Sequence, residues 1–268
     1  MKRAFQHYQL KKQLEVLEQV KAIYDADDGR SDDEKKEESE KLLSKRLEEL
    51  REMIDSENIE NDVVVQIANE FWENNDTELM QDGIILRRVA GSDKDKFIEL
   101  EIENSALPDK YEDESFRDSM WEGHNDDTSI VFTIEKDEEY VGYCAIKDIA
   151  KIKWEISIEL LRKFHRQGIG YTAISMMLDA VKERLGVSEF RIRIYSDNIA
   201  SRKLFEKLGA VPNGISEFLI HNKKDIDEFE EMYMHTITDD LREVAKQFNV
   251  EPRKLLSHVL EYKLVWGK

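Results

Sequence analysis

The sequence predicts an α+β protein in which a β-sheet domain lies between two helical segments. Through about residue 80, apolar residues recur at three- and four-residue steps, with one glycine and no proline, which is typical of helices. From Gly83 the chain changes to short runs rich in β-branched and aromatic residues, separated by turns. We therefore divide it into a helical, coiled-coil-like region at 1–80, a mixed domain at 81–221 and a C-terminal helical extension at 222–268.

Two apolar stripes predict a helical hairpin near the start of the chain. The first stripe holds Leu10, Leu14 and Leu17, and the second holds Leu43, Leu47, Leu50 and Ile54. Residues 25–30 are the predicted turn, and Ser31 with Glu34 forms a capping box that starts the second helix. The acidic turn lacks the spaced oxygen ligands and the closing glutamate of a calcium loop. A hairpin of this kind suits self-association or contact with a protein partner.

A third helix and five strands follow the hairpin. The helix, at about 60–74, presents an apolar face that we expect to pack on the next domain, formed by Val64, Ile67, Ala68, Phe71 and Trp72. The predicted strands are 84–89, 129–135, 140–147, 154–161 and 190–195. A hairpin loop at 137–139 joins the second of these strands to the third.

The remaining helices are predicted between the strands and after them. Residues 93–124 form two helices joined near Pro108, and in domains of this plan such helices often roof a substrate cleft. Within them Tyr111 and Trp121 either line an acceptor pocket or pack in the core.

After about residue 222 the pattern predicts three further helices, at 227–235, 238–248 and 255–265, the last led by Pro252. A DNA-binding helix-turn-helix is a weak alternative for this extension, because its surroundings are acidic and its basic residues are few.

The most informative stretch is a strand, a glycine turn and a helix. The strand at 154–161 leads into the turn His165-Arg166-Gln167-Gly168-Ile169-Gly170, and an apolar helix runs from there through Leu185. Two glycines allow the backbone to pass close to a ligand, and the helix start offers unpaired N–H groups to a pyrophosphate. A dinucleotide-binding Rossmann site is disfavoured, because its third glycine and its acidic ribose ligand are missing.

A second cluster about 30 residues downstream makes the pattern specific. It runs Ser196-Asp197-Asn198-Ile199-Ala200-Ser201-Arg202-Lys203-Leu204-Phe205-Glu206-Lys207-Leu208-Gly209-Ala210. Together the two stretches resemble the signature motifs of the GCN5-related N-acetyltransferase (GNAT) superfamily, over residues 84–220. The resemblance implies a mixed, mostly antiparallel sheet whose fourth and fifth strands splay apart, with acetyl-CoA as the cosubstrate lying in the opening.

The resemblance also implies a set of cofactor contacts. They come from backbone groups of Ile158 and Leu160 along the pantetheine, from His165, Arg166, Gln167, Gly168, Ile169, Gly170 and Tyr171 around the pyrophosphate, and from Asn198, Ser201 and Phe205 in the second motif. Three positions depart from the family pattern. His165 stands where Arg or Gln is usual, although Arg166 beside it supplies charge. Phe205 replaces a tyrosine that in many members protonates the departing thiolate, and Ala210 replaces an aromatic residue.

Two carboxylates on the strand at 154–161 are candidates for the general base. Glu155 and Glu159 share one face of this strand with Ser157, and attack on a thioester requires that a base take a proton from the acceptor ammonium. Glu155 stands where some family members carry a glutamate base, and Glu159 is the second candidate. The alternative is that both are solvated strand carboxylates.

These residues predict an N-acetyltransferase that moves an acetyl group to a primary amine by direct attack in a ternary complex. The alternative is a catalytically silent acyl-CoA-binding module whose helical additions engage a protein partner, which Phe205 motivates. The formal charge of −19 argues against nucleic acid or an anionic membrane and favours a cationic acceptor, unless the acidity serves only solubility.

Composition suggests a soluble, cytoplasmic protein without a metal. Cys144 is the single cysteine, so no internal disulfide and no thiolate zinc site can form, and its apolar surroundings predict a buried thiol. The six histidines show no metal-ligand spacing. No apolar run approaches the ~18 residues needed to cross a bilayer.

Overall fold

The computed structural model describes residues 20, 22–24, 30–55, 61–73, 77–105, 107–149, 151, 153–217 and 223–267. Leu10, Leu14 and Leu17 of the first predicted stripe lie outside these residues, as does the predicted turn apart from Arg30. Helix α2 (Asp32–Asp55) begins at the predicted capping box. The Ser31 N–H donates to Glu34 Oε2 at 2.8 Å, and the Glu34 N–H donates to Ser31 Oγ at 3.3 Å. This helix start is confirmed.

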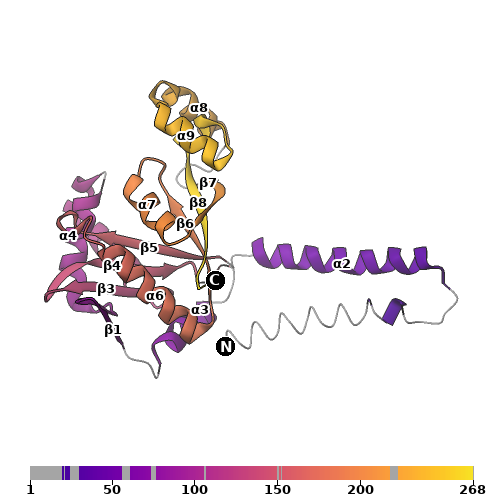
Figure 1. Ribbon diagram of the computed structural model, residues 1–268, viewed down its shortest axis with the longest axis horizontal. Coiled ribbons are helices and arrows are strands. Elements are labelled where there is room, and N and C mark those ends of the chain that lie inside the picture. Colours follow the sequence, from indigo (N-terminus) through magenta and orange to yellow (C-terminus); the bar gives the residue numbers. More distant parts are fainter. Residues whose placement is uncertain are drawn as a thin grey trace.

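Helix α2 extends away from the sheet, with a short helical segment at 22–24 beside it (Figure 1). The Lys35 ammonium donates to the Tyr24 carbonyl at 3.3 Å, and both Ile23 and Ser39 are buried. The second stripe is exposed at Leu43, its one member whose side chain is described.

Helix α3 (Asn61–Trp72) packs on the sheet as expected. Its five predicted core residues are all buried. The Trp72 and Phe71 rings meet Phe132 of the sheet at centroid distances of 4.9 and 5.7 Å. Aromatic pairs at such distances add about 0.5–1.5 kcal/mol each beyond their buried area, so α3 belongs structurally to the domain that follows it.

Eight strands form one mixed, mostly antiparallel sheet (Figure 1). They are β1 (Glu78–Gln81), β2 (Ile84–Arg88), β3 (Ile130–Lys136), β4 (Glu139–Lys147), β5 (Trp154–Leu160), β6 (Glu189–Ile194), β7 (Val211–Glu217) and β8 (His258–Val265). Their order is β1-β2-β3-β4-β5-β6-β8-β7, and among these described strands only β5 and β6 pair in parallel. The five predicted strands and the hairpin loop are confirmed, whereas β1, β7 and β8 were not predicted.

The C-terminal prediction was correct for two helices and wrong for the third. Helices α8 (Lys223–Tyr233) and α9 (Asp239–Phe248) are present, joined by a 3-10 turn at Met234–Thr236. Residues 255–265 are not a helix, because a 3-10 turn at Pro252–Leu256 precedes strand β8. This strand lies between β6 and β7, and its buried Leu260, Tyr262 and Leu264 alternate with the charged Glu261 and Lys263, the period of two that identifies a strand. The C-terminal segment is therefore a helical insertion followed by a strand of the main sheet.

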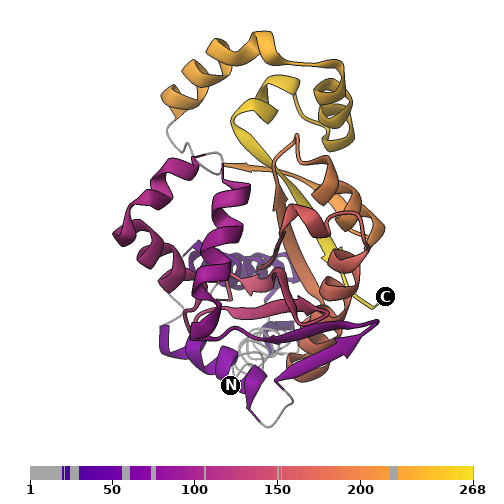
Figure 2. The ribbon, with the colours of Figure 1, turned by 90° about the vertical axis from the view of Figure 1, so that its left-hand side faces the viewer.

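Helices cover the two faces of the sheet in two groups (Figure 2). Helices α6 (Ile169–Leu185) and α7 (Ile199–Lys207) pack with α3 and α9 in the larger core. Helices α4 (Lys94–Asn104) and α5 (Glu114–His124), with the 3-10 turn Pro108–Glu112 between them, build a second core against β3 and β4. The predicted helix pair joined near Pro108 is confirmed.

A buried ion pair anchors the start of α4 to the sheet. Asp93 is 5% exposed and accepts hydrogen bonds from the Arg87 guanidinium at 2.7 and 2.8 Å and from the Thr133 hydroxyl at 2.8 Å. Burial alone would raise the pKa of Asp93, but these donors outweigh it and hold the pKa below its usual value. The position of α4 over the sheet is therefore fixed by a charged residue that stays ionised.

Among the described residues, no helix combines the length and the apolar character that crossing a bilayer requires.

Candidate active site

The parallel strands β5 and β6 separate soon after they begin. Within the described chain they pair only at Trp154 with Phe190 and at Glu155 with Arg191. On its other side β5 stays paired with β4 as far as Leu160, opposite Gly142. The edge of β5 beyond Glu155 therefore turns toward an opening in the sheet, at the place where the resemblance implies splayed strands.

A glycine turn connects the open end of β5 to helix α6. Gly168 precedes the helix with a φ of +81°, a left-handed conformation that favours glycine. A Cβ at Gly170 would lie 3.3 Å from Leu204 Cδ2 and 3.4 Å from Ile158 Cδ1. The first glycine thus serves the bend, and the second allows α6 to approach β5 and α7 closely.

The start of α6 offers backbone donors to an anion. Gly168 has no side chain to cap the helix, and an added Cβ there would meet no atom within 4 Å. The N–H groups of Tyr171 and Thr172 already donate to the Gly168 carbonyl, at 3.0 and 3.2 Å. The Tyr171 amide, one of those expected at the pyrophosphate, is therefore hydrogen-bonded within the helix. The amides from Arg166 to Gly170 remain the expected donors to the pyrophosphate.

The side chains of the turn differ in their contacts. His165 Nε2 lies 2.9 Å from the Leu160 carbonyl oxygen, to which the Asn104 amide also donates at 3.3 Å. The Gln167 amide donates to the Lys163 carbonyl at 2.9 Å, and Arg166 is exposed. His165 thus closes the turn onto β5, and the Leu160 carbonyl already has partners within the protein.

The second motif has structural tasks that the family resemblance did not indicate. Asn198 Oδ1 accepts the Ser201 N–H at 3.1 Å and caps helix α7. Phe205 is 2% exposed and packs in the larger core, which leaves almost none of its surface for a ligand. The expected contact between Phe205 and the cofactor therefore finds no support in its burial.

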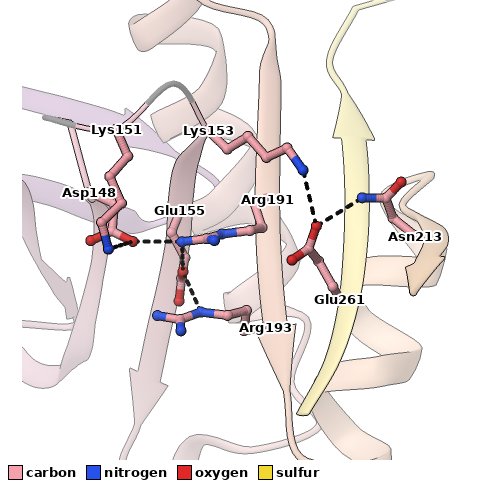
Figure 3. Close-up of polar contacts among 8 residues, drawn as sticks. All are labelled: Asp148, Lys151, Lys153, Glu155, Arg191, Arg193, Asn213 and Glu261. Atoms are coloured by element: carbon pink, nitrogen blue, oxygen red, sulfur yellow. Dashed lines mark hydrogen bonds and ion pairs between the residues drawn. The ribbon is translucent and has the colours of Figure 1, made fainter. Parts of the chain in front are cut away.

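Glu155 is held by two arginines of the neighbouring strand (Figure 3). Its Oε2 accepts from the Arg191 guanidinium at 2.9 Å and from Arg193 Nε at 2.7 Å, and Arg191 also pairs with Asp148 at 2.7 Å. Figure 3 shows a second polar group beyond them, in which Glu261 accepts from Lys153 and Asn213. Both arginines bind Oε2 of Glu155, and these two ion pairs favour a structural role for this carboxylate.

Glu159, the second candidate, faces a polar group under α4. The Tyr143 hydroxyl donates to Glu159 Oε1 at 3.2 Å, and the Asn104 amide lies 3.4 Å from Oε2. Close by, Glu101 of α4 accepts from the Tyr111 hydroxyl at 3.0 Å. Burial, together with the negative charge of Glu159, raises the pKa of Glu101 to about 7.

The strand residues alone gave no indication of Glu101. A signal was present, because Glu101 lies four residues after the buried Phe97 and next to the buried Leu100, on the inner face of an amphipathic helix. A carboxylate on such a face needs a partner or a task. Of the two expectations for Tyr111, core packing is confirmed, since it is 6% exposed, and its hydroxyl donates to Glu101.

The other reactive side chains are buried. Burial raises the pKa of the Cys144 thiol far above its usual range, in keeping with the predicted buried thiol. Burial also lowers the pKa of His124 to about 3, and its ring stacks on Phe97 at 3.9 Å. In the part of the chain that the structure describes, no group of three or more His, Cys, Asp or Glu side chains is placed to hold a metal ion.

The fold and the glycine turn define an acyl-CoA-dependent transferase domain, and comparison with known sequences gives the family. Residues 84–211 match the family described as the acetyltransferase (GNAT) domain. These residues, just under half of the chain, are therefore a GNAT acetyltransferase domain. No protein with a curated description matches the sequence.

Solved structures with a similar fold are also acetyltransferases. Spermidine N-acetyltransferase from Vibrio cholerae, in complex with CoA and spermine, is 17% identical over 69% of this chain and 96% of its own, with a TM-score of 0.48. Ribosomal-protein-S5-alanine acetyltransferase from Vibrio fischeri is 12% identical over 72% and 100%, with a TM-score of 0.47. The microcin C7 self-immunity acetyltransferase, in complex with acetyl-CoA and AMP, is 15% identical over 69% and 93%, with a TM-score of 0.47.

Proposed function

We propose that the protein transfers an acetyl group from acetyl-CoA to a primary amine by direct attack in a ternary complex. The observation that carries the proposal is the opening between β5 and β6, which adjoins the uncapped start of α6. The unpaired β5 edge supports backbone contacts with an extended pantetheine chain, and the uncapped start of α6 supports a pyrophosphate site formed by the amides from Arg166 to Gly170. When bound, acetyl-CoA would supply the thioester carbonyl that the amine attacks.

The chemistry requires the protein to place an amine and to remove one proton from its ammonium form before attack, and the nitrogen loses a second proton as the amide forms. The amine nitrogen forms a bond to the carbonyl carbon, the carbon–sulfur bond breaks, and CoA leaves as the thiolate. Phe205 cannot donate a proton, so the thiolate is protonated from solvent or stays ionised. The side chains of the protein therefore have to act on the amine. The carboxylates under α4 have the negative charge that suits a cationic acceptor.

Adding a negative charge at the pyrophosphate turn tests the cofactor site. In Gln167→Glu an exposed carboxylate would face the phosphates, and repulsion of about 1 kcal/mol should weaken acetyl-CoA binding roughly fivefold in a calorimetric titration. Gln81→Glu adds the same charge at an exposed position on β1, at the far edge of the sheet, and should bind like the wild type. Equal affinities of the two variants, or no binding to the wild type, would contradict the proposed site.

Replacing Glu155 tests its ion-pair role. Glu155→Gln leaves Arg191 and Arg193 without this carboxylate, and we expect a stability loss of roughly 1–3 kcal/mol because the group is only partly exposed. Turnover of an amine panel, followed by CoA release, should fall less than tenfold at saturating amine. Glu189→Gln on the exposed side of β6 is the matched control, since its partner Lys263 is a surface residue. A hundredfold loss of turnover in a stable Glu155→Gln protein would restore Glu155 as the base.

The alternative of a silent acyl-CoA-binding module makes a different prediction for the same assays. Phe205 is the observation that favours it. Tight acetyl-CoA binding without CoA release, across a broad panel of amines and peptides, would support the module and exclude the transferase.

A further inference from the structure

The side chains between α4 and the sheet form a site that neither the family motifs nor the alternation along β5 indicated. We define it as the dyad site, which consists of Glu101 from α4, Glu159 from β5, Tyr111 from the 3-10 turn, Tyr140 and Tyr143 from β4, and Asn104 from the end of α4. Each glutamate accepts a tyrosine hydroxyl, Glu101 from Tyr111 at 3.0 Å and Glu159 from Tyr143 at 3.2 Å. The Asn104 amide lies 3.4 Å from Glu159 Oε2, and Glu101 is three residues before Asn104 on the same face of α4, which brings the two carboxylates together.

A buried polar atom beside the carboxylates points independently to a ligand. The Tyr140 hydroxyl is shielded from solvent and has no hydrogen-bond partner among the described residues. Burial raises the pKa of Tyr140, and the charges of Asp93, Glu101 and Glu159 raise it further, so its hydroxyl lies near all three carboxylates. A shielded hydroxyl without a partner is unfavourable, because it has lost its hydrogen bonds to water. A ligand with N–H groups would satisfy this oxygen as well as the two carboxylates.

The position of the dyad site fits an acceptor amine. Glu159 lies on the same strand as the edge that opens toward acyl-CoA, and its side chain points to the sheet face that α4 covers. Within the described chain, Lys147 is the one cation whose charge lowers the pKa of Glu101. It lowers this pKa less than the Tyr111 hydrogen bond does, and less than burial and the charge of Glu159 raise it. Two carboxylates with one weakly acting ammonium leave an excess of negative charge, which an acceptor ammonium would neutralise.

We propose, resting on the acetyl transfer proposed above, that the ammonium of the acceptor binds between Glu101 and Glu159 and that Glu101 takes its proton. One proton passes from the ammonium to the Glu101 carboxylate, which frees the nitrogen lone pair for the thioester carbonyl. The nitrogen attacks the carbonyl carbon and gives its second proton to solvent, the carbon–sulfur bond breaks, and CoA leaves as the thiolate. Glu101 then returns the first proton to solvent. Because a general base is most effective with a pKa near the working pH, the raised pKa of Glu101 suits it to this step.

The test compares Glu101→Gln and Glu159→Gln with Glu99→Gln, which removes the same charge from an exposed position on α4. Glu101→Gln should lower kcat at least a hundredfold and abolish the acidic limb near pH 7 in the pH profile. Glu159→Gln should shift that limb to lower pH, because removing a neighbouring negative charge lowers the pKa of Glu101. Glu99→Gln should leave kcat and the profile unchanged. An unshifted limb in both dyad variants, or near-wild-type kcat in Glu101→Gln, would overturn the proposal.

Binding of 1,4-diaminobutane to the CoA-loaded protein, measured by calorimetry, separates this inference from the proposed reaction. Binding that Glu101→Gln and Glu159→Gln each weaken tenfold or more, and Glu99→Gln does not, supports the dyad site even if acetyl transfer fails. Transfer that survives in both dyad variants overturns the site and leaves the transferase in place. Diamine binding that neither variant changes also overturns it.

Discussion

Gly142→Ala is expected to destabilise the domain by about 3 kcal/mol or more. Gly142 of β4 has a φ of +152°, and an added Cβ would lie 2.1 Å from the Glu159 carbonyl oxygen and 2.8 Å from Leu160 Cα. Both atoms belong to backbone, so β5 itself would have to move, and strain and overpacking each cost about 1–3 kcal/mol. The shift would fall on Glu159 and on the edge expected to bind pantetheine, so acetyl-CoA affinity should fall as well.

Thermal unfolding checks this expectation, with Gly186→Ala as the control. Gly186 ends α6 with a φ of +67°, but a Cβ there would meet no atom within 4 Å. The control therefore isolates the backbone strain, which costs about 1 kcal/mol. A melting temperature for Gly142→Ala equal to that of Gly186→Ala would show that β5 yields without cost, contrary to the packing described above.

Glu101→Gln is expected to make the protein more stable above pH 7. Burial and the charge of Glu159 raise the pKa of Glu101 from 4.5 to about 7 in the folded protein. Between these values the unfolded chain loses a proton that the folded protein keeps, so stability falls as the pH rises through this range. A glutamine does not ionise and still accepts the Tyr111 hydroxyl. At pH 8 it should therefore restore up to about 3 kcal/mol.

Denaturant unfolding at pH 4 and pH 8 measures the effect. Glu101→Gln and wild type should be about equally stable at pH 4, where the carboxyl is mostly protonated in both states, and should differ at pH 8. The titration of His124, whose burial lowers its pKa to about 3, is common to both proteins and cancels in the difference. Destabilisation by Glu101→Gln at pH 8 would mean that the ionised carboxylate is well solvated or paired. A gain in stability coupled to a loss of turnover is characteristic of a functional residue.

Periodicity and turn chemistry located most of the fold. The five predicted strands are half-buried or buried runs of β-branched and aromatic residues, and they are present. Strand β7 escaped prediction because Pro212, Asn213 and Gly214 are turn-forming residues. A proline is acceptable there because β7 is the edge strand of the sheet. Strand β8 escaped because Pro252 favoured a helix start, although Leu260, Tyr262 and Leu264 alternate with the charged Glu261 and Lys263 as in a strand.

The sequence alone predicted one part of the candidate site, the glycine turn, but not the other part, the dyad site. The glycine turn is formed by consecutive residues, so its motif can be recognised in the order of the amino acids alone. The dyad site joins α4 to β5 across 58 positions of the chain, and only the folded sheet brings Glu101 to Glu159. Glu155 illustrates the converse, since its spacing suits a base but its surroundings depend on Arg191 and Arg193, more than 30 residues later.

Because of the place of β8 in the sheet, the domain can be completed only after β8 has been synthesised. Strands β6 and β7 do not pair with each other, because β8 lies between them and pairs with both. Until residues 258–265 leave the ribosome, the nascent chain carries two unsatisfied strand edges and an inserted pair of helices with its apolar side uncovered. Such edges are templates for aggregation. The last of the eight strands to be translated therefore closes the sheet, and a stop codon a few residues upstream of it should yield an insoluble product.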